Sequence, residues 1–155
     1  MAATGMIRQF RNEDARACSD IIQACIERDE QISLDARRQV RASASPAALA
    51  EFSGLYYMAV YELGDRIAGI CGLDMNEIRL LYVSPLHQGR GIGSTLLENI
   101  ESMVPGALFS DIFVYSALSA QSFYRAHGFR AGGEHVFRPS GIPIRTVFMA
   151  KPVVF

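Results

Sequence analysis

The sequence contains no apolar run long enough to cross a membrane. Half of its 155 residues are hydrophobic, yet no stretch approaches the ~20 apolar residues that a spanning helix needs. The first ten residues, "MAATGMIRQF", do not place an apolar run behind a basic region, so they lack the pattern of a secretory leader. The sequence therefore predicts a cytoplasmic protein without a membrane partner.

Charge of either sign is not in excess. Lys and Arg together number 15 and Asp and Glu 16, which gives a net charge of -1. A nucleic-acid-binding surface usually leaves a basic excess, and none is present. We therefore expect no nucleic-acid partner.

Cysteine is scarce, and metal-ligand spacing is missing. The three cysteines are an odd number and contain no C-x-x-C pair, which favours a reducing compartment over a disulfide framework or a zinc site. The three histidines also lack metal-ligand spacing. No bound metal is predicted, and a structural role is assigned to His87, His127, His135 and Cys71.

The chain also lacks internal repeats, low-complexity tracts and long linkers, so its length predicts one domain over residues 1–155. Periodicity predicts the order strand, helix, helix, three strands, helix, strand, helix, two strands. This order indicates an α/β fold: a mixed, mainly antiparallel sheet of six to seven strands, with about four helices on both faces.

Several boundaries follow from local signals. Asn12 is predicted to cap a first helix that runs to about Glu30, and Pro46 to break a helical region over residues 34–52. "GD" is predicted to turn a hairpin between strands at residues 55–63 and 66–74. Further strands are expected at residues 77–83, 108–116, 129–137 and 144–150, and further helices at residues 92–103 and 119–127.

The segment "QGRGIGSTLL", residues 88–97, packs three glycines into six positions before a helix-forming stretch. It is not a Rossmann fingerprint, because Ser94 stands at the sixth position counted from Gly89. It is not a Walker A loop, because no lysine lies nearby. A glycine-rich turn at a helix N-terminus suits a pyrophosphate; the alternative from spacing alone is a turn without a ligand.

Two motifs here resemble the GCN5-related N-acetyltransferases. Residues 88–93, Q-G-R-G-I-G, match the family pattern Q/R-x-x-G-x-G/A between a strand and a helix. The segment "ALSAQSFYRAHGF", which begins at Ala117, is similar to the second cofactor motif, where an aromatic residue and a tyrosine precede Gly-Phe. The resemblance covers residues 66–137, and the N-terminal half matches only in its order of elements.

The resemblance implies acetyl-CoA as cosubstrate. Its pantetheine arm would pair with the backbone of Leu81, Tyr82 and Val83, in the gap between that strand and the one ending near Ser116. An N–H of Leu81 or Tyr82 would polarise the thioester carbonyl. The N–H groups that would hold the pyrophosphate belong to Gln88, Gly89, Arg90, Gly91, Ile92, Gly93 and Ser94.

One position departs from the family pattern. Many members place an asparagine seven residues before the motif tyrosine, and this chain has Ala117 there. Ser119 is a candidate to replace that contact with the pantetheine. Arg90 and Arg125 are candidates for the phosphates, or else solvated side chains.

Acetyl transfer to an amine requires a group that accepts the amine proton. Glu77 matches the position where some family members carry a general-base glutamate; the alternative is a solvated carboxylate, with a water chain as base. Asp74 is a weaker candidate. Glu77, Arg79, Leu81 and Val83 are expected on one face of an ideal strand. Arg79 could hold a substrate carboxylate or form a surface ion pair.

Tyr124 aligns with the family tyrosine that hydrogen-bonds the coenzyme sulfur and protonates the leaving thiolate; the alternative is a packing role. Together these residues predict direct acetyl transfer to a primary amine of a small molecule or peptide. A CoA-binding regulatory or sensor module without turnover, and transfer of a longer acyl group, stay open. Exposed edge strands allow a homodimer.

Overall fold

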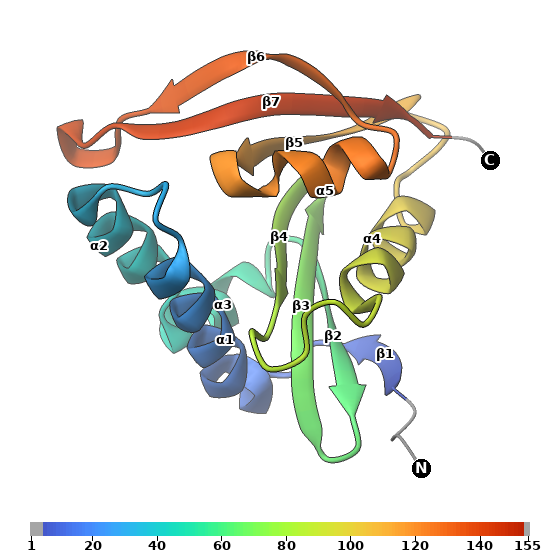
Figure 1. Cartoon of the computed structure of the whole chain (residues 1–155). Helices are drawn as coiled ribbons and strands as arrows, with labels where there is room; N and C mark the ends of the chain where they lie inside the picture. The colour runs from blue at the N-terminus through green and yellow to red at the C-terminus, as the bar shows by residue number, and fades with distance from the viewer. Residues whose placement is uncertain (1–4, 154–155) are drawn as a thin grey trace.

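A computed structural model describes residues 5–153 of the chain, so the first four residues of the N-terminal stretch considered above lie outside it. Seven strands form one sheet in the order β1-β2-β3-β4-β5-β7-β6 (Figure 1). Neighbouring strands are antiparallel except β4 and β5, which are parallel. The mixed, mainly antiparallel α/β fold predicted from periodicity is confirmed. The strands are β1 (Gly5–Gln9), β2 (Tyr57–Leu63), β3 (Arg66–Asp74), β4 (Glu77–Val83), β5 (Asp111–Ala117), β6 (Arg130–Phe137) and β7 (Ile144–Pro152).

Helices cover both faces of the sheet. On one face α1, α2 and α3 enclose a core that includes Cys18, Ile22 and Ile70. On the other, α4 and α5 enclose a core that includes Leu96, Leu97 and Tyr124. Figure 1 shows α1 to α3 on one side of β3 and β4, and α4 on the other. The helices are α1 (Ala15–Arg28), α2 (Leu34–Ser43), α3 (Pro46–Phe52), α4 (Ile92–Ser102) and α5 (Gln121–Ala126).

The start of the first helix differs from the prediction. Asn12 does not cap α1; it opens a 3-10 turn over Asn12–Asp14, and α1 follows from Ala15. The carboxylate of Asp14 accepts the backbone N–H of Arg11 at 2.7 Å, which draws the chain into this tighter turn. The helix ends at Arg28 rather than at Glu30.

The helical region over residues 34–52 divides as Pro46 predicted. The hydroxyl of Ser33 accepts the N–H of Ala36 at 3.2 Å and begins α2, and that of Ser45 accepts the N–H of Ala48 at 3.2 Å and begins α3. Pro46 occupies the first turn of α3, where a helix needs no N–H donor. The two helices therefore meet at a capped joint.

Among the described residues, no helix is both long enough and apolar enough to cross a membrane.

Candidate functional site

The glycine loop joins β4 to α4 and leaves a row of backbone donors free. Gly89 and Gly91 have φ values of +78° and +83°, in the left-handed region that favours glycine, and Gly91 is the N-cap residue of α4. In the described part of the chain, the N–H groups of residues 88–94 donate no hydrogen bond, whereas the N–H of Thr95 already bonds the carbonyl of Gly91 at 3.1 Å. Free, clustered N–H groups at a helix N-terminus form an anion site. The segment thus fits a pyrophosphate.

The side chain of Gln88 fixes the loop to the strand before it. Its amide nitrogen donates to the carbonyl oxygen of Val83 at 3.0 Å. The Cys25 thiol, on α1, donates to the same oxygen at 3.2 Å. Of the two, sequence reasoning assigned only Gln88 to the site, because the position of Cys25 depends on how α1 packs.

Strands β4 and β5 diverge where the pantetheine was expected. They pair only at Glu77 with Phe113 and at Ile78 with Val114, so the rest of β4 has no neighbour on that side. Because the Val83 carbonyl is bonded from that side and backbone groups alternate along a strand, the groups of Leu81 also point into the gap. The N–H of Tyr82 points toward β3 instead. Of the two candidates for polarising the thioester, the geometry favours Leu81.

A β-bulge at Arg79 overturns one expectation about side-chain directions. The register pairs Leu73 with Ile78 and Gly72 with Leu80, which leaves Arg79 as an extra residue in β4. Alternation therefore shifts within the strand. Glu77 and Arg79 do not share a face with Leu81 and Val83. Leu81, Val83 and Ile78 belong to the core under α4, and Leu80 and Tyr82 belong to the core under α1.

Glu77 and Arg79 lie on the α1 to α3 side of the sheet. Their side chains form an ion pair at 3.5 Å, and the Glu77 side chain is 25% exposed. The Arg79 guanidinium lies 5.8 Å from the centre of the Tyr56 ring, which stacks on Phe52 at 5.7 Å. The carboxylate thus has access to solvent and a positive neighbour.

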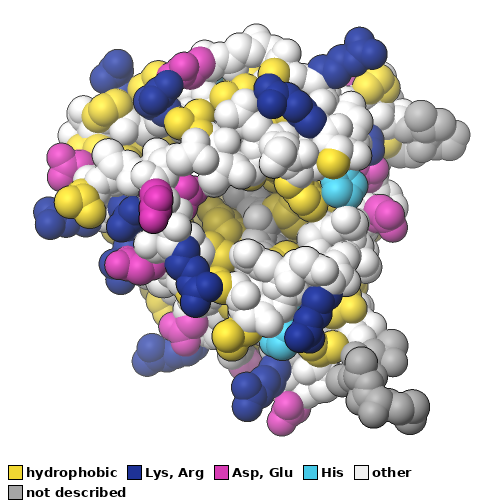
Figure 2. Space-filling model, viewed as in Figure 1, with side chains coloured by type: hydrophobic (Ala, Val, Ile, Leu, Met, Phe, Trp, Pro, Cys, Tyr) yellow, Lys and Arg dark blue, Asp and Glu magenta, His cyan; other side chains and the backbone are white. Residues whose placement is uncertain are grey.

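A pocket of about 250 Å³ lies beside this ion pair. Its lining is mainly apolar and aromatic, with one cation. In the view of Figure 2 the surface is hollowed near its centre, with hydrophobic side chains around the hollow, where Figure 1 draws β4. Such a lining suits an apolar or aromatic group. The pocket is lined by Ile22, Val40, Ser43, Ala44, Phe52, Tyr56, Arg79, Leu80 and Tyr82.

Two phenols, Tyr124 on α5 and Tyr82 on β4, are largely buried and lie close enough to interact. Tyr124 on α5 is 5% exposed and packs edge-on against Phe129 at 5.2 Å. Burial, with a smaller contribution from the nearby Tyr82 phenol, raises the pKa of Tyr124 above its ordinary value. Burial also raises the pKa of Tyr82, to about 12. Neither hydroxyl bonds another described residue, and neither is a fully buried unpaired atom. Both phenols are protonated at neutral pH and free to donate.

The remaining predicted residues are exposed. The Ser119 hydroxyl donates to the Asp29 carboxylate at 2.5 Å instead of standing free for a cofactor. Arg90 is exposed, with Nη1 3.5 Å from Nδ1 of His87. Arg125 is exposed and donates to the Gln121 side chain at 3.3 Å. These two exposed cations are candidates for a phosphate, and no carboxylate in the described chain pairs with either of them.

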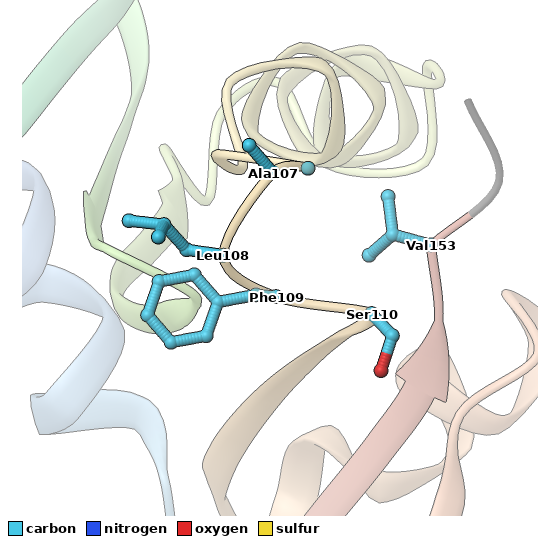
Figure 3. Close-up of a pocket in the computed structure, with 6 residues that line it drawn as sticks. Ala107, Leu108, Phe109, Ser110 and Val153 are labelled. Carbon is cyan, nitrogen blue, oxygen red and sulfur yellow. The ribbon is translucent and has the colours of Figure 1, made fainter.

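A second pocket, of about 320 Å³, lies away from all of these residues. It is formed by residues 106–110, between α4 and β5, and by Val153 (Figure 3). Mainly small and apolar groups line it, and it holds none of the predicted site residues. Over the described residues, His, Cys, Asp and Glu side chains form no group of three that could hold a metal ion.

A family model described as an acetyltransferase (GNAT) domain matches residues 21–151. The sequence matches none of the curated proteins with which it was compared. Among solved structures, a GCN5-related N-acetyltransferase from Rhodopseudomonas palustris is similar with a TM-score of 0.86 and 24% identity, over 98% of this chain and 98% of that one.

Two further similar structures contain a coenzyme. YncA from Salmonella typhimurium, solved with acetyl-CoA, has a TM-score of 0.69 and 18% identity over 99% of this chain and 96% of its own. The PaiA N-acetyltransferase from Thermoplasma acidophilum, in complex with coenzyme A, has a TM-score of 0.68 and 18% identity over 96% of this chain and 99% of its own. Because all three identities are below 25%, the similarity shows a shared fold.

Proposed function

Because the chain belongs to the GNAT acetyltransferase domain family, we propose that it transfers an acetyl group from acetyl-CoA directly to a primary amine of a small molecule or peptide. One observation carries the proposal: the unpaired N–H groups of residues 88–94 lie at the end of β4, next to the gap between β4 and β5. The first feature suits a pyrophosphate and the second an extended arm. The coenzyme-bound structures of YncA and PaiA support the same ligand.

The residues of the loop and strand would hold the cosubstrate. The N–H groups of residues 88–94 would bind its pyrophosphate, and Leu81 would pair with its pantetheine amides, while Gln88 keeps the loop against Val83. Acetyl-CoA supplies an activated thioester. Leu81 would donate its N–H to the thioester oxygen and stabilise the negative charge that develops there.

Two side chains would assist the transfer. Glu77, partly exposed beside the pocket, would accept the proton of the acceptor amine, directly or through water, as the amine nitrogen bonds the acyl carbon and the carbon–sulfur bond breaks. Tyr124 would donate to the leaving sulfur. Because its pKa is raised, it would stabilise the thiolate by a hydrogen bond more readily than by giving up its proton.

The 250 Å³ pocket on the α1 to α3 side is the proposed acceptor site. Phe52, Tyr56 and Leu80 give it an apolar body, and Arg79 offers a cation at its edge. We therefore favour an amine with an apolar or aromatic body, alone or with a carboxylate, over a polyamine.

The test is release of coenzyme A from acetyl-CoA over a panel of amines, followed with a thiol reagent and with product mass. The panel should pair aromatic amines with polyamines, aromatic amino acids with their amides, and free amines with short peptides. Acetylated product at the amine supports the proposal. Tight binding of acetyl-CoA with no turnover on any amine would instead identify a binding module, and absence of acetyl-CoA binding would refute the site. Propionyl-CoA and butyryl-CoA tell whether a longer acyl group is preferred.

A further inference from the structure

Ser94 and His127 form a hydrogen-bonded pair beside the glycine loop. Ser94 lies in the first turn of α4, and its hydroxyl oxygen is 2.8 Å from Nε2 of His127, the residue that follows α5. The other ring nitrogen, Nδ1, is 2.8 Å from the carbonyl oxygen of Phe123. The imidazole also packs against the Phe123 ring, with centroids 4.5 Å apart. Both nitrogens of His127 are therefore engaged.

The partners of the ring fix where its proton lies. A carbonyl oxygen can only accept, so Nδ1 carries a hydrogen. In a neutral imidazole Nε2 is then an acceptor, and it takes the hydroxyl hydrogen of Ser94. The hydroxyl of Ser94 then has no hydrogen left to donate to an anion, and its lone pairs repel one. In the imidazolium Nε2 donates instead, and the hydroxyl hydrogen of Ser94 becomes free for an anion.

Ser94 itself belongs to the row of free backbone donors. The N–H of Ser94 is the last of the unpaired groups over residues 88–94. Given the acetyl-CoA site proposed above, we propose that Ser94 and His127 couple binding of the coenzyme pyrophosphate to uptake of a proton by His127. In the bound state the Ser94 hydroxyl donates to the pyrophosphate. The positive charge of the His127 imidazolium lies one hydrogen bond behind it.

The other charges around the imidazole largely offset one another. Lys151 of β7 donates to the backbone carbonyl of His127 at 2.9 Å, and it pairs with Glu101 of α4 at 2.7 Å. Arg125 on α5 is exposed and bonds Gln121. Glu98, one turn beyond Ser94 on α4, is exposed, as is Arg130 at the start of β6. An anion at the loop is thus the added charge to which the imidazole responds.

The test is calorimetric titration of dephospho-coenzyme A into the full-length protein, in buffers of different ionisation heat at the same pH. Dephospho-coenzyme A keeps the pyrophosphate and lacks the 3′-phosphate, whose own titration near pH ~6 would add protons. The expected result is uptake of up to one proton per ligand bound. Where free His127 is neutral, the dissociation constant should rise by up to about tenfold per pH unit.

Two variants separate coupling from packing. Ser94→Ala should bind more weakly and take up no proton. His127→Gln places an amide donor near Ser94 that does not titrate, so it should also take up no proton but keep its affinity as the pH rises. His135→Asn, on β6 and away from the loop, should retain the uptake, and pantetheine, which lacks the pyrophosphate, should show none.

The outcomes distinguish the coupling from the proposed function. Binding of dephospho-coenzyme A without proton uptake by the unmodified protein, or uptake that persists in Ser94→Ala, would overturn the coupling and leave the acetyl-CoA site intact. Absence of binding by coenzyme A itself would overturn the proposed site and the coupling with it.

Discussion

The hydroxyl of Ser119 donates to the carboxylate of Asp29 at 2.5 Å, although the two residues are 90 positions apart in the chain. Asp29 is the C-cap residue of α1, and its backbone carbonyl accepts a hydrogen bond from the Arg37 guanidinium at 2.9 Å. Ser119 lies in the turn between β5 and α5. The bond therefore joins the turn after α1 to the turn after β5.

Replacing Ser119 with alanine is expected to loosen the turn after α1 without unfolding the protein. One exposed side-chain bond is lost, so the free energy of unfolding should change by less than about 1 kcal/mol. Amide hydrogen exchange over residues 29–33 should become faster, because that turn loses its tie to the other side. Ser122→Ala, an exposed serine on α5, is the matched control and should leave this exchange unchanged. Equal exchange in both variants would mean that the bond does not restrain the turn after α1.

Tyr124→Phe should lower kcat by about 100-fold, the low end for removing a hydrogen-bond donor to a charge that develops in the transition state, and change the dissociation constant of coenzyme A little. The ring stays in its packing site, and the hydroxyl has no partner among the described residues, so the melting temperature should hold or rise slightly. Tyr115→Phe, on β5, controls for loss of a phenol elsewhere. If kcat and cofactor affinity fall equally in Tyr124→Phe, the phenol positions the cofactor and does not assist the leaving group.

Glu77→Gln should reduce kcat/KM by about 100-fold and change the acidic side of the pH–rate profile, because the amide cannot accept a proton. Its neighbour Arg79 stays in place, so binding of acetyl-CoA should be retained. Asp74→Asn tests the weaker candidate at the end of β3. An unaltered pH profile in Glu77→Gln would remove this carboxylate from the mechanism and favour a water chain.

The fold was predictable where short-range patterns determine it. The strand predicted at residues 77–83 has the observed bounds of β4, and Pro46 predicts the break between α2 and α3. The first helix was less predictable, because the bond from the Arg11 N–H to Asp14 competes with the capping role expected of Asn12. Local composition gives no measure of that competition.

The candidate site was predictable as a motif but not as a geometry. The extra residue at Arg79 reverses the alternation of side chains within β4. The residue types around Arg79 do not predict a bulge at this position. The partners of Ser94 and Ser119 lie in distant parts of the chain, so no periodicity relates them. His127 was assigned a structural role because the histidines lack metal-ligand spacing, and Cys25 was not placed at the site. Their positions follow only from the packing of α1 and α5.

Alkaline pH should destabilise the protein through its buried phenols. Burial raises the pKa of Tyr82 to about 12 from an ordinary value of 10.0, so the folded state keeps its proton to a higher pH than the unfolded chain does. The stabilisation is complete below pH 10.0 and is lost as the pH rises toward about 12. Denaturant unfolding at pH values across this range should show a smaller decrease in the free energy of unfolding for Tyr82→Phe than for the unmodified protein. A loss of equal size would mean that Tyr82 titrates in the folded state as it does in the unfolded chain.

Asp14 should contribute to the free energy of unfolding in a way that changes at acidic pH, whereas Tyr82 acts at alkaline pH. Its buried carboxylate accepts two hydrogen bonds from Arg8, at 2.8 and 2.9 Å, and one from the Arg11 N–H at 2.7 Å. The bonds from Arg8 are the main reason that the pKa of Asp14 lies below its ordinary value of 3.8. Asp14→Asn should therefore cost about 3 kcal/mol at neutral pH, the low end for breaking a buried ion pair.

The pH dependence of this cost follows from the lowered pKa of Asp14. The stabilisation is present above pH 3.8 and is lost as the pH falls below that value, because the unfolded chain binds the proton first. Denaturant unfolding should give a difference in the free energy of unfolding between the unmodified protein and Asp14→Asn that is steady at neutral pH and narrows as the pH falls below 3.8. Asp20→Asn, an exposed carboxylate on α1, should stay within about 0.5 kcal/mol of the unmodified protein throughout. A gap that is independent of pH would assign the loss to packing around the 3-10 turn and not to the charge of Asp14.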